Sequence, residues 1–187
     1  METIVPTPTS AAGPGLDALA QTLHRFFHCL DGFDYAGLLA CCTDDFRWLR
    51  QGRWLDGPDA VRAALALRPR TQRVAHLISN TFVNEADAGS AKARDGAPGA
   101  TPRLPTEVAT ESYMTAYRAD IGSADLGSSS APARTVQPYR INRVRSRFRL
   151  HGDIWLLAEQ QLSTEFEFVA ALRPADDTPT PIGGTST

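Results

Sequence analysis

Two ionisable residues, His76 and Asp31, have the side chains best suited to move a proton. A histidine changes charge near neutral pH, so it can take up and release protons under physiological conditions. Asp31 is expected at the end of a helix, where the helix dipole disfavours a negative charge and eases proton uptake by the carboxylate. The structural alternatives are a buried histidine satisfied by one hydrogen bond and a helix-ending turn at Asp31-Gly32.

The strand that carries His76 supplies further candidates. Residues 72–85 lack glycine and proline and are predicted to form one long strand. Alternate residues of a strand share a face, so four side chains are expected beside His76: Val74, Ile78, Asn80 and Phe82. Polar His76 and Asn80 among apolar neighbours are typical of the wall of a mostly apolar pocket.

Aromatic residues give additional pocket-lining candidates. Tyr113 and Tyr117 share one face of a strand predicted over residues 107–118, where they either line the pocket or are ordinary strand residues. Trp48 and Trp54 flank a short predicted hairpin, and they lie either at the pocket mouth or in the core.

The arginines, cysteines and remaining histidines are not spaced in a way that indicates a catalytic or metal site. Four arginines occupy alternate positions from 143 to 149, which is typical of a solvated sheet face. Three cysteines, two of them adjacent, fit neither a disulfide framework nor a metal site, and they are expected to be small buried residues. The other histidines lack metal-ligand spacing, so no metal and no cofactor are expected.

The elements that position these residues come in two blocks. Apolar residues spaced by three and four predict a helix over 16–31, followed by helices over 34–42 and 57–68. Strands are predicted over 46–50, 53–55, 72–85, 107–118, 139–150 and 154–168, with a short strand near 90–94. Segregated helices and strands indicate an α+β fold, with a four-stranded antiparallel sheet curling around the helices.

The composition of the chain excludes several classes of protein. The chain has 187 residues, and 19 basic against 21 acidic residues leave a net charge of −2, which argues against a nucleic-acid binder. No apolar run is long enough to span a bilayer, and the N-terminus lacks a signal peptide, so a cytoplasmic protein is expected. We predict one domain over 16–170, between disordered tails at 1–15 and 171–187.

Four segments in this order resemble a known superfamily: LHRFFHCLDGFDYAGLLACCTDDFRW, LDGPDAVRAAL, RVAHLISNTFV and HGDIWLLAEQQL. Together they are similar to the SnoaL-like branch of the nuclear transport factor 2-like superfamily. The resemblance implies a cone-shaped α+β barrel whose strongly curved, mostly antiparallel sheet wraps a pocket closed by the first helix. It also matches Asp31 and His76 to polar positions of the pocket wall, and Trp155 to a structural tryptophan.

The superfamily includes polyketide cyclases, dehydratases, isomerases and non-enzymatic binding proteins, so the fold alone does not decide the function. We expect a small, apolar, oxygenated ligand in a closed pocket and cofactor-free dehydration, isomerisation or cyclisation. Asp31 and His76 would be the acid/base pair, and a tyrosine or Asn80 would hold the substrate oxygen. The alternatives are a non-catalytic binding or assembly module and the small subunit of a ring-hydroxylating dioxygenase.

The last strand also predicts a partner. Residues 154–158 are apolar at every position, so alternation puts Trp155 and Leu157 on one face and Ile154, Leu156 and Ala158 on the other, and one of these sets lies away from the core. An exposed apolar patch of this kind indicates a covered surface, and a second copy of the sheet is the simplest cover. A homodimer is therefore expected, with no nucleic acid and no membrane as partners.

Overall fold

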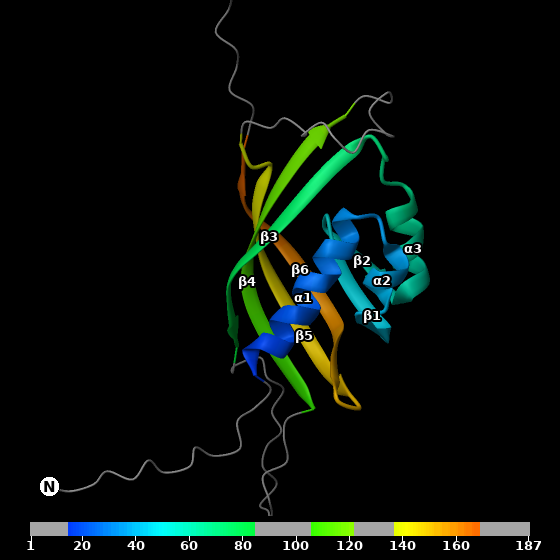
Figure 1. Ribbon diagram of the computed structural model, residues 1–187, viewed down its shortest axis with the longest axis vertical. Coiled ribbons are helices and arrows are strands. Elements are labelled where there is room, and N and C mark those ends of the chain that lie inside the picture. Colours follow the sequence, from blue (N-terminus) through cyan, green and yellow to red (C-terminus); the bar gives the residue numbers. More distant parts are fainter. Residues whose placement is uncertain (1–14, 85–105, 122–136, 169–187) are drawn as a thin grey trace, which may run out of the picture.

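The computed structural model describes residues 15–84, 106–121 and 137–168 (Figure 1). The predicted tails, apart from Gly15, and the predicted short strand near 90–94 lie outside these residues. Helices and strands follow in this order: α1 (Leu16–Asp31), α2 (Tyr35–Leu39), β1 (Cys42–Arg50), β2 (Arg53–Asp56), α3 (Gly57–Ala66), β3 (Gln72–Val83), β4 (Glu107–Asp120), β5 (Arg140–His151) and β6 (Ile154–Glu167).

All six strands belong to one curved sheet with the order β2-β1-β6-β5-β4-β3. Neighbouring strands are antiparallel except β1 and β6, which are parallel. The predicted α+β class is confirmed, but the sheet is larger than the predicted four strands because the β1–β2 hairpin adds to its edge through β6. It is also open, since β2 and β3 form its two edges, and so it is not closed into a barrel.

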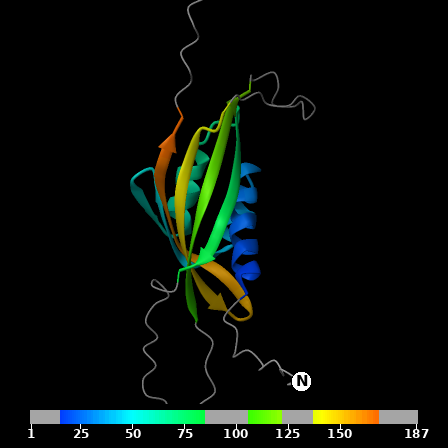
Figure 2. The same cartoon turned by 90° about the vertical axis from the view of Figure 1, so that its left-hand side faces the viewer.

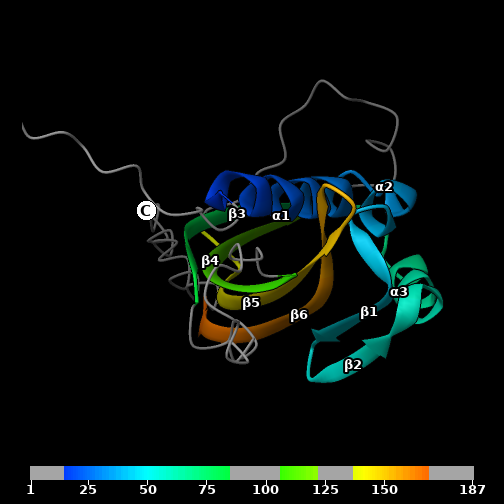
Figure 3. The same cartoon turned by 90° about the horizontal axis from the view of Figure 1, so that it is seen from below.

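Helix α1 covers the concave side of the sheet (Figure 3). Its apolar positions recur every three or four residues, and the buried set is Leu19, Leu23, Phe26, Phe27, Cys29 and Leu30. A view turned by 90° shows α1 running beside the edge strand β3 (Figure 2), against which it packs. The C-terminus of α1 is thereby held next to the strand that carries His76.

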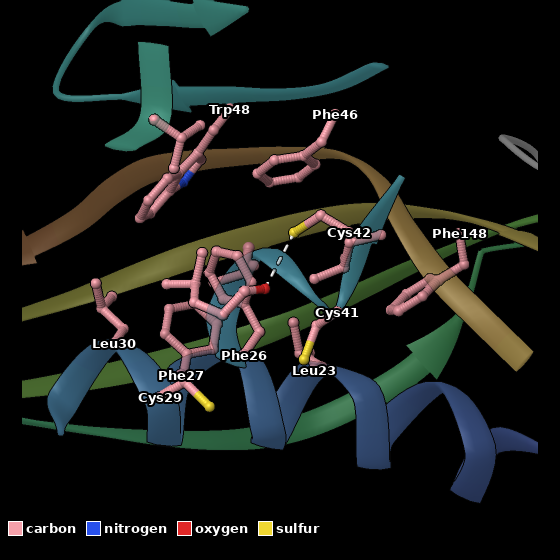
Figure 4. Packing of buried hydrophobic residues seen from close by; sticks show 14 of the residues in the cluster. Leu23, Phe26, Phe27, Cys29, Leu30, Cys41, Cys42, Phe46, Trp48 and Phe148 are labelled. Atoms are coloured by element: carbon pink, nitrogen blue, oxygen red, sulfur yellow. Dashed lines mark hydrogen bonds between the residues drawn. The ribbon is translucent and has the colours of Figure 1, made fainter. Parts of the chain in front are cut away.

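The core is built from aromatic side chains that meet between α1 and β1. Phe26 packs edge-on against Trp48, Phe46 and its neighbour Phe27, with ring centroids 5.3–5.9 Å apart (Figure 4). All four side chains are at most 1% exposed. Burial of such side chains contributes about 1.5–3 kcal/mol each to folding, so this contact fixes α1 against the sheet.

The second helix is shorter than predicted. The side chain of Asp34 caps it by accepting a hydrogen bond from the backbone N–H of Gly37 at 2.8 Å. The helix ends at Leu39, and Cys42 begins β1 rather than closing the helix. Cys42 is nevertheless buried, like the other two cysteines, and all three thiols are free.

Two bulges change which side chains face the core. In β3 the pairing shifts between Ser79 and Phe82, where Asn80 takes a left-handed backbone conformation with φ 52°. In β6 the residues that pair with Phe148 and Arg147 are Leu157 and Glu159, so Ala158 is an extra residue. A bulge reverses the alternation of faces beyond it, which a strict period of two does not anticipate.

The convex face of β4, β5 and β6 is strongly charged. The row of arginines predicted on β5 lies here, and three of its four members pair with acidic residues of β1, β4 and β6. Glu111 accepts from Arg143 at 2.5 Å and from Arg145 at 3.1 Å, while Arg149 pairs with Glu107 and Asp45 at 3.0 Å. These arginines therefore belong to a solvent-facing ion-pair network. No helix in the described residues is long and apolar enough to cross a membrane.

Candidate functional site

A cavity of about 180 Å³ lies between α1 and the concave side of the sheet. Residues from α1, β1 and β3 to β6 line it, so the cavity depends on the whole fold. The apolar part of its lining includes Phe27, Leu30, Trp48, Met114 and Leu162. The polar part consists of His76, Asn142, Thr164, Tyr139, Gln51, Gln72 and four arginines. Its wall thus combines apolar surface with many polar and cationic groups, and a concave site that joins apolar walls to polar groups is suited to a small molecule.

Asp31 and His76 are in direct contact at the wall of this cavity. One carboxylate oxygen, Oδ1, lies 2.5 Å from the ring nitrogen Nδ1 of His76. The other oxygen, Oδ2, accepts a hydrogen bond from the backbone N–H of His76 at 2.9 Å. Both side chains are largely buried, with His76 12% and Asp31 22% exposed. The carboxylate therefore fixes both the position and the ring orientation of the histidine.

The two residues have different places relative to the cavity. His76 lines it, whereas Asp31 does not and instead faces a separate surface hollow next to Phe33. The ring of Phe27 packs against the imidazole with centroids 5.2 Å apart and limits its movement. The expectation that both residues face one cavity is thus corrected: Asp31 reaches the cavity only through the histidine.

This arrangement determines what the histidine can do. When the neutral ring donates Nδ1–H to Asp31, the other nitrogen, Nε2, is left as a proton acceptor. Within the described part of the chain, Nε2 has no hydrogen-bond partner. The carboxylate also stabilises the positive ring that forms when Nε2 takes up a proton. The pair is therefore equipped for general base and general acid chemistry.

Of the two tryptophans predicted to line the cavity, on β1 and β2, only one does so. Trp48 is almost fully buried and lines the cavity. Trp54 does not line it; its ring lies outside, beneath the guanidinium of Arg47 at 4.4 Å, and borders a second hollow beside α3. The turn Gln51-Gly52, in which both residues have positive φ, reverses the chain between the two strands and separates the two tryptophans.

The predicted lining residues on β3 other than His76 lie outside the cavity, for two different reasons. Ile78 lies on the inward face with His76, but it packs against the core and does not line the cavity. Asn80 is exposed and outside the cavity, because it occupies the bulge itself. Beyond the bulge, Phe82 points outward and is 51% exposed. The proposed role of Asn80 in holding a substrate oxygen is therefore not supported by its position.

The two tyrosines lie on the wrong face for the cavity. On β4 the lining residues are Met114, Ala116 and Arg118, which occupy even positions. Tyr113 and Tyr117 occupy odd positions and thus lie on the convex face. Tyr113 is next to the ion-pair network, where its hydroxyl accepts a hydrogen bond from Arg143 at 3.4 Å. Neither tyrosine is placed to contact a ligand.

Sequence reasoning missed a polar pair on β5 and β6. The hydroxyl of Thr164 donates to Oδ1 of Asn142 at 3.0 Å, and both residues line the cavity. This leaves the Asn142 amide N–H groups as donors for a ligand oxygen. A signal was present, because Asn142 alternates with Val144 and Phe148 on the strand face opposite the arginines.

Four arginines in the lining were also missed: Arg50, Arg68, Arg118 and Arg140. No aspartate or glutamate among the described residues lines the cavity. The guanidinium carbons of Arg118 and Arg140 lie 4.1 and 4.6 Å from the ring of Tyr139. Arg50 could have been anticipated, because it alternates with Phe46 and Trp48 along β1.

Arg50 and Arg68 influence each other. Burial lowers the pKa of the Arg50 guanidinium, and the nearby positive charge of Arg68 lowers it further. Arg50 lies over the ring of Trp48 at 5.5 Å. Arg68 donates from Nη1 to the backbone oxygen of Leu30 at 2.5 Å and stacks on Phe33 at 4.5 Å. Two like charges are thus held close together in the cavity lining.

A row of buried polar side chains crosses the sheet beside the cavity. Trp48, Gln160, Ser146 and Thr110 are register partners across β1, β6, β5 and β4. Each is at most 3% exposed. Their side-chain nitrogen and oxygen atoms have no hydrogen-bond partner in the described part of the chain. Such unpaired groups reduce the free energy of unfolding.

The described residues contain no cluster of three histidine, cysteine or acidic side chains that could hold a metal ion. The site consists instead of a carboxylate-held histidine, amide and guanidinium donors, and apolar walls. With the curved sheet and its covering helix, these features define a class of α+β proteins with a ligand-sized cavity under the first helix.

Comparison with known proteins identifies the family within this class. Residues 16–159 match the model of the SnoaL-like domain, so the chain belongs to the SnoaL-like family. The predicted resemblance to this branch of the nuclear transport factor 2-like superfamily is confirmed. No curated protein matches the sequence.

Solved structures share the fold at low sequence identity. Aln2 from a Streptomyces species has a TM-score of 0.59 and 19% identity, covering 83% of this chain and 94% of its own. An NTF2-like protein with a cystatin-like fold from Novosphingobium aromaticivorans has a TM-score of 0.54 and 12% identity, covering 80% of each chain. A protein from the same organism, described as the beta subunit of an aromatic-ring-hydroxylating dioxygenase, has a TM-score of 0.55 and 15% identity. The match covers 83% of this chain and 92% of that protein. These likenesses establish the fold.

Proposed function

We propose that the protein binds a small, largely apolar, oxygenated molecule in the cavity and performs cofactor-free acid/base chemistry on it. The observation that carries this proposal is that the Asp31 carboxylate holds His76 at the cavity wall through two contacts, one with the backbone N–H and one with ring nitrogen Nδ1. A histidine that only filled space would need one partner at most. Here the carboxylate orients the ring so that the cavity-lining residue keeps an unpaired nitrogen.

The chemistry follows from the positions of the donors and acceptors. Nε2 of His76 removes a proton from a carbon next to a carbonyl group, and the electron pair moves onto the carbonyl oxygen. The Asn142 amide donates a hydrogen bond to that oxygen and stabilises its negative charge. The protonated ring, stabilised by Asp31, then returns the proton to another carbon or to a departing hydroxyl group. Dehydration and isomerisation use these steps. In an aldol-type cyclisation the enolate carbon instead forms a bond to a second carbonyl carbon, and the protonated ring gives its proton to the alkoxide oxygen that results.

The proposal is tested with ligand and variant together. Mass spectrometry of the native protein should detect a co-purified ligand, whose location electron density would then give. His76→Ala should retain the fold and lower turnover of that ligand by about 10²–10⁴-fold, the usual contribution of a general acid or base. His151→Ala, on an exposed hairpin turn away from the cavity, is the matched control. Full activity of His76→Ala would rule out the acid/base role.

Ligand binding without catalysis is the second candidate function. It is favoured by the cavity itself, which does not require the histidine to react. A co-purified ligand that remains chemically unchanged on prolonged incubation with wild-type protein would support it. The likeness to a dioxygenase beta subunit supplies a third candidate, an assembly subunit, which would associate with a large partner rather than act alone.

We further propose that the protein is a homodimer, but through a different part of the sheet than residues 154–158. Ala158 is buried in its bulge, which leaves Ile154 and Leu156 as a smaller outward set. The convex face of β3 and β4 is more apolar: Leu77 is 54% and Phe82 51% exposed, beside Tyr113 and Tyr117. An apolar patch of this kind is usually covered by a partner.

Light scattering tests the dimer directly. The wild-type protein should have twice the 20.3 kDa chain mass at micromolar concentration, and Leu77→Arg should yield a monomer. Leu67→Arg, which alters an equally apolar and even more exposed residue after α3, should remain dimeric. A wild-type monomer would contradict the proposal, and a trimer would favour the assembly-subunit function.

A further inference from the structure

Arg50 and Arg68 lie where two hollows of the molecule meet. Both line the cavity that contains His76, and both also line the neighbouring hollow of about 570 Å³ beside α3. Gln51 and Gln72 are shared in the same way. Two guanidinium groups and two amides thus gather at one end of the ligand cavity, and they come from β1, β3 and the segment after α3.

Neither of these arginines has an acidic partner. Within the described residues, no carboxylate lies within ion-pair distance of Arg50 or Arg68. Their contacts include the Trp48 and Phe33 rings and the backbone oxygen of Leu30, and the buried Tyr35 hydroxyl lies near enough to Arg50 to act on it electrostatically. On the convex face, by contrast, Arg143, Arg145 and Arg149 all pair with glutamates.

This arrangement has an energetic cost in the empty protein. Arg50 is half-buried, and both this burial and the positive charge of Arg68 disfavour its charged guanidinium, which lowers its pKa. Removing a guanidinium from water is unfavourable unless a negative charge or hydrogen bonds compensate for it. Paired arginines without acidic neighbours are instead suited to bind a carboxylate, because their planar N–H groups match its two oxygens.

We propose that Arg50 and Arg68 bind a carboxylate group of the ligand, so that the ligand is an apolar acid rather than a neutral molecule. Gln51, and the one amide N–H of Gln72 that is not bonded to Asp120, offer further hydrogen-bond donors at the same end of the cavity. The apolar body of the ligand would lie against Phe27, Trp48 and Met114 and extend toward His76. This inference rests on the proposed function, since it concerns the ligand of the same cavity.

A pair of probes that differ only in charge tests the carboxylate site. 1-Naphthaleneacetate and its neutral amide, 1-naphthaleneacetamide, have nearly the same size and shape. Calorimetric titration should show at least 10-fold tighter binding of the carboxylate to wild-type protein. Arg50→Gln and Arg68→Gln should each reduce this preference at least fivefold while leaving the affinity for the amide unchanged.

Arg147→Gln is the matched control, since it removes the same charge from an exposed position on the convex face. It should keep the wild-type preference for the carboxylate. Thermal unfolding checks the fold of each variant, and Arg50→Gln should be at least as stable as wild type because repulsion from Arg68 is removed.

The outcomes distinguish a failure of the carboxylate site from a failure of the proposed ligand cavity. Equal binding of the two probes would overturn the carboxylate site but leave a ligand cavity in place. A carboxylate preference that survives both cavity substitutions would also overturn it, because the charge would be recognised elsewhere. Binding of neither probe would contradict the carboxylate site and the proposed ligand cavity together.

Discussion

The carboxylate of Asp31 contacts His76 at two atoms, the ring nitrogen Nδ1 at 2.5 Å and the backbone nitrogen at 2.9 Å. The contact joins the last residue of α1 to the edge strand β3. It therefore serves two purposes, since it fastens the helix over the cavity and sets the orientation of the only histidine in the cavity lining of the described residues.

Asp31→Asn should change the tautomer of the His76 imidazole. The asparagine amide would donate to Nδ1, so the ring proton would move to Nε2 and the free acceptor in the cavity would be lost. Nitrogen chemical shifts of the His76 ring report this change directly. Activity on the cavity ligand should fall by about 10²–10⁴-fold, even though the side chain keeps its size.

Asp34→Asn is the control for this substitution. Asp34 lies three residues further along, caps α2, and does not contact His76. Asparagine is also a good helix cap, so the fold should be unaffected. If the ring nitrogen shifts of His76 were the same in Asp31→Asn and wild type, the orienting role of Asp31 would be contradicted.

The ion-pair network on the convex face should make stability depend on pH through Glu111. Burial opposes the charged carboxylate, but hydrogen bonds from Arg143 and Arg145 outweigh burial, so the pKa of Glu111 lies below its ordinary value of 4.5. A lowered pKa stabilises the folded state above pH 4.5, and this contribution disappears as the pH falls through the lowered value.

Glu111→Gln should accordingly cost about 1 kcal/mol of unfolding free energy at pH 7. In urea titrations the difference from wild type should shrink steadily as the pH is lowered below 4.5. Glu165→Gln, which removes a carboxylate paired with Arg143 alone, should have a smaller effect. A difference that widened at acid pH would show that Glu111 is not stabilised as its charged form.

The three cysteines should be unreactive in the folded protein. Burial raises the pKa of the Cys29 thiol, and the negative charge of Asp34 raises it further. Burial likewise raises the pKa of Cys41 and, far above its usual range, that of Cys42. Because the thiolate is the reactive form, a disulfide reagent at pH 8 should label none of them within minutes.

Unfolding in guanidinium should then expose all three thiols to rapid labelling, which calibrates the measurement. Rapid labelling of one thiol in the native protein would mean that its surroundings open frequently, and single cysteine-to-alanine variants would identify it.

Gln160 offers a test of the buried polar row. Its side chain is fully buried, and neither amide atom has a partner in the described residues. Gln160→Met keeps the approximate volume and removes the unpaired polar atoms, so it should raise the free energy of unfolding by about 1–3 kcal/mol. Chemical denaturation measures the change.

Gln161→Met is the neighbouring control. Gln161 faces outward and donates to Glu159 at 2.8 Å near the surface, so its loss should change stability by less than about 0.5 kcal/mol. A destabilised Gln160→Met would indicate that an ordered water or a ligand atom completes the hydrogen bonds of the wild-type amide.

Much of this molecule follows from local patterns in the sequence. The three- and four-residue spacing from Leu16 to Leu30 determines the buried face of α1, and the cap at Asp34 determines where α2 begins. The alternation along residues 140–151 already separates the outward arginines from the inward apolar side chains. These features depend only on residues close together in the chain, because the regular repeat of a helix or strand decides which of them share a face.

The composition of the cavity depends on pairing between distant segments. Asn80 lies outside the cavity because a bulge reverses the faces of β3, and Ala158 is absent from the convex face for the same reason on β6. A single extra residue in one strand is invisible in a pattern of period two until its partner strand is known. The sequence could not predict which way Tyr113 and Tyr117 point for a related reason. Alternation divides the residues of a strand between two faces, but it does not show which face is turned toward the core.

Only the tertiary structure decided which polar groups meet. Residue type and resemblance predicted Asp31 and His76 as an acid/base pair, but their direct contact arises from the packing of α1 against β3. The strand pattern placed Arg50 on the inward face of β1, but nothing in the sequence related it to Arg68. The fold brings the two half-buried arginines to the lining of one cavity, with no carboxylate of the described residues within ion-pair distance. The energy of a charge depends on its surroundings in space, and sequence position does not contain that information.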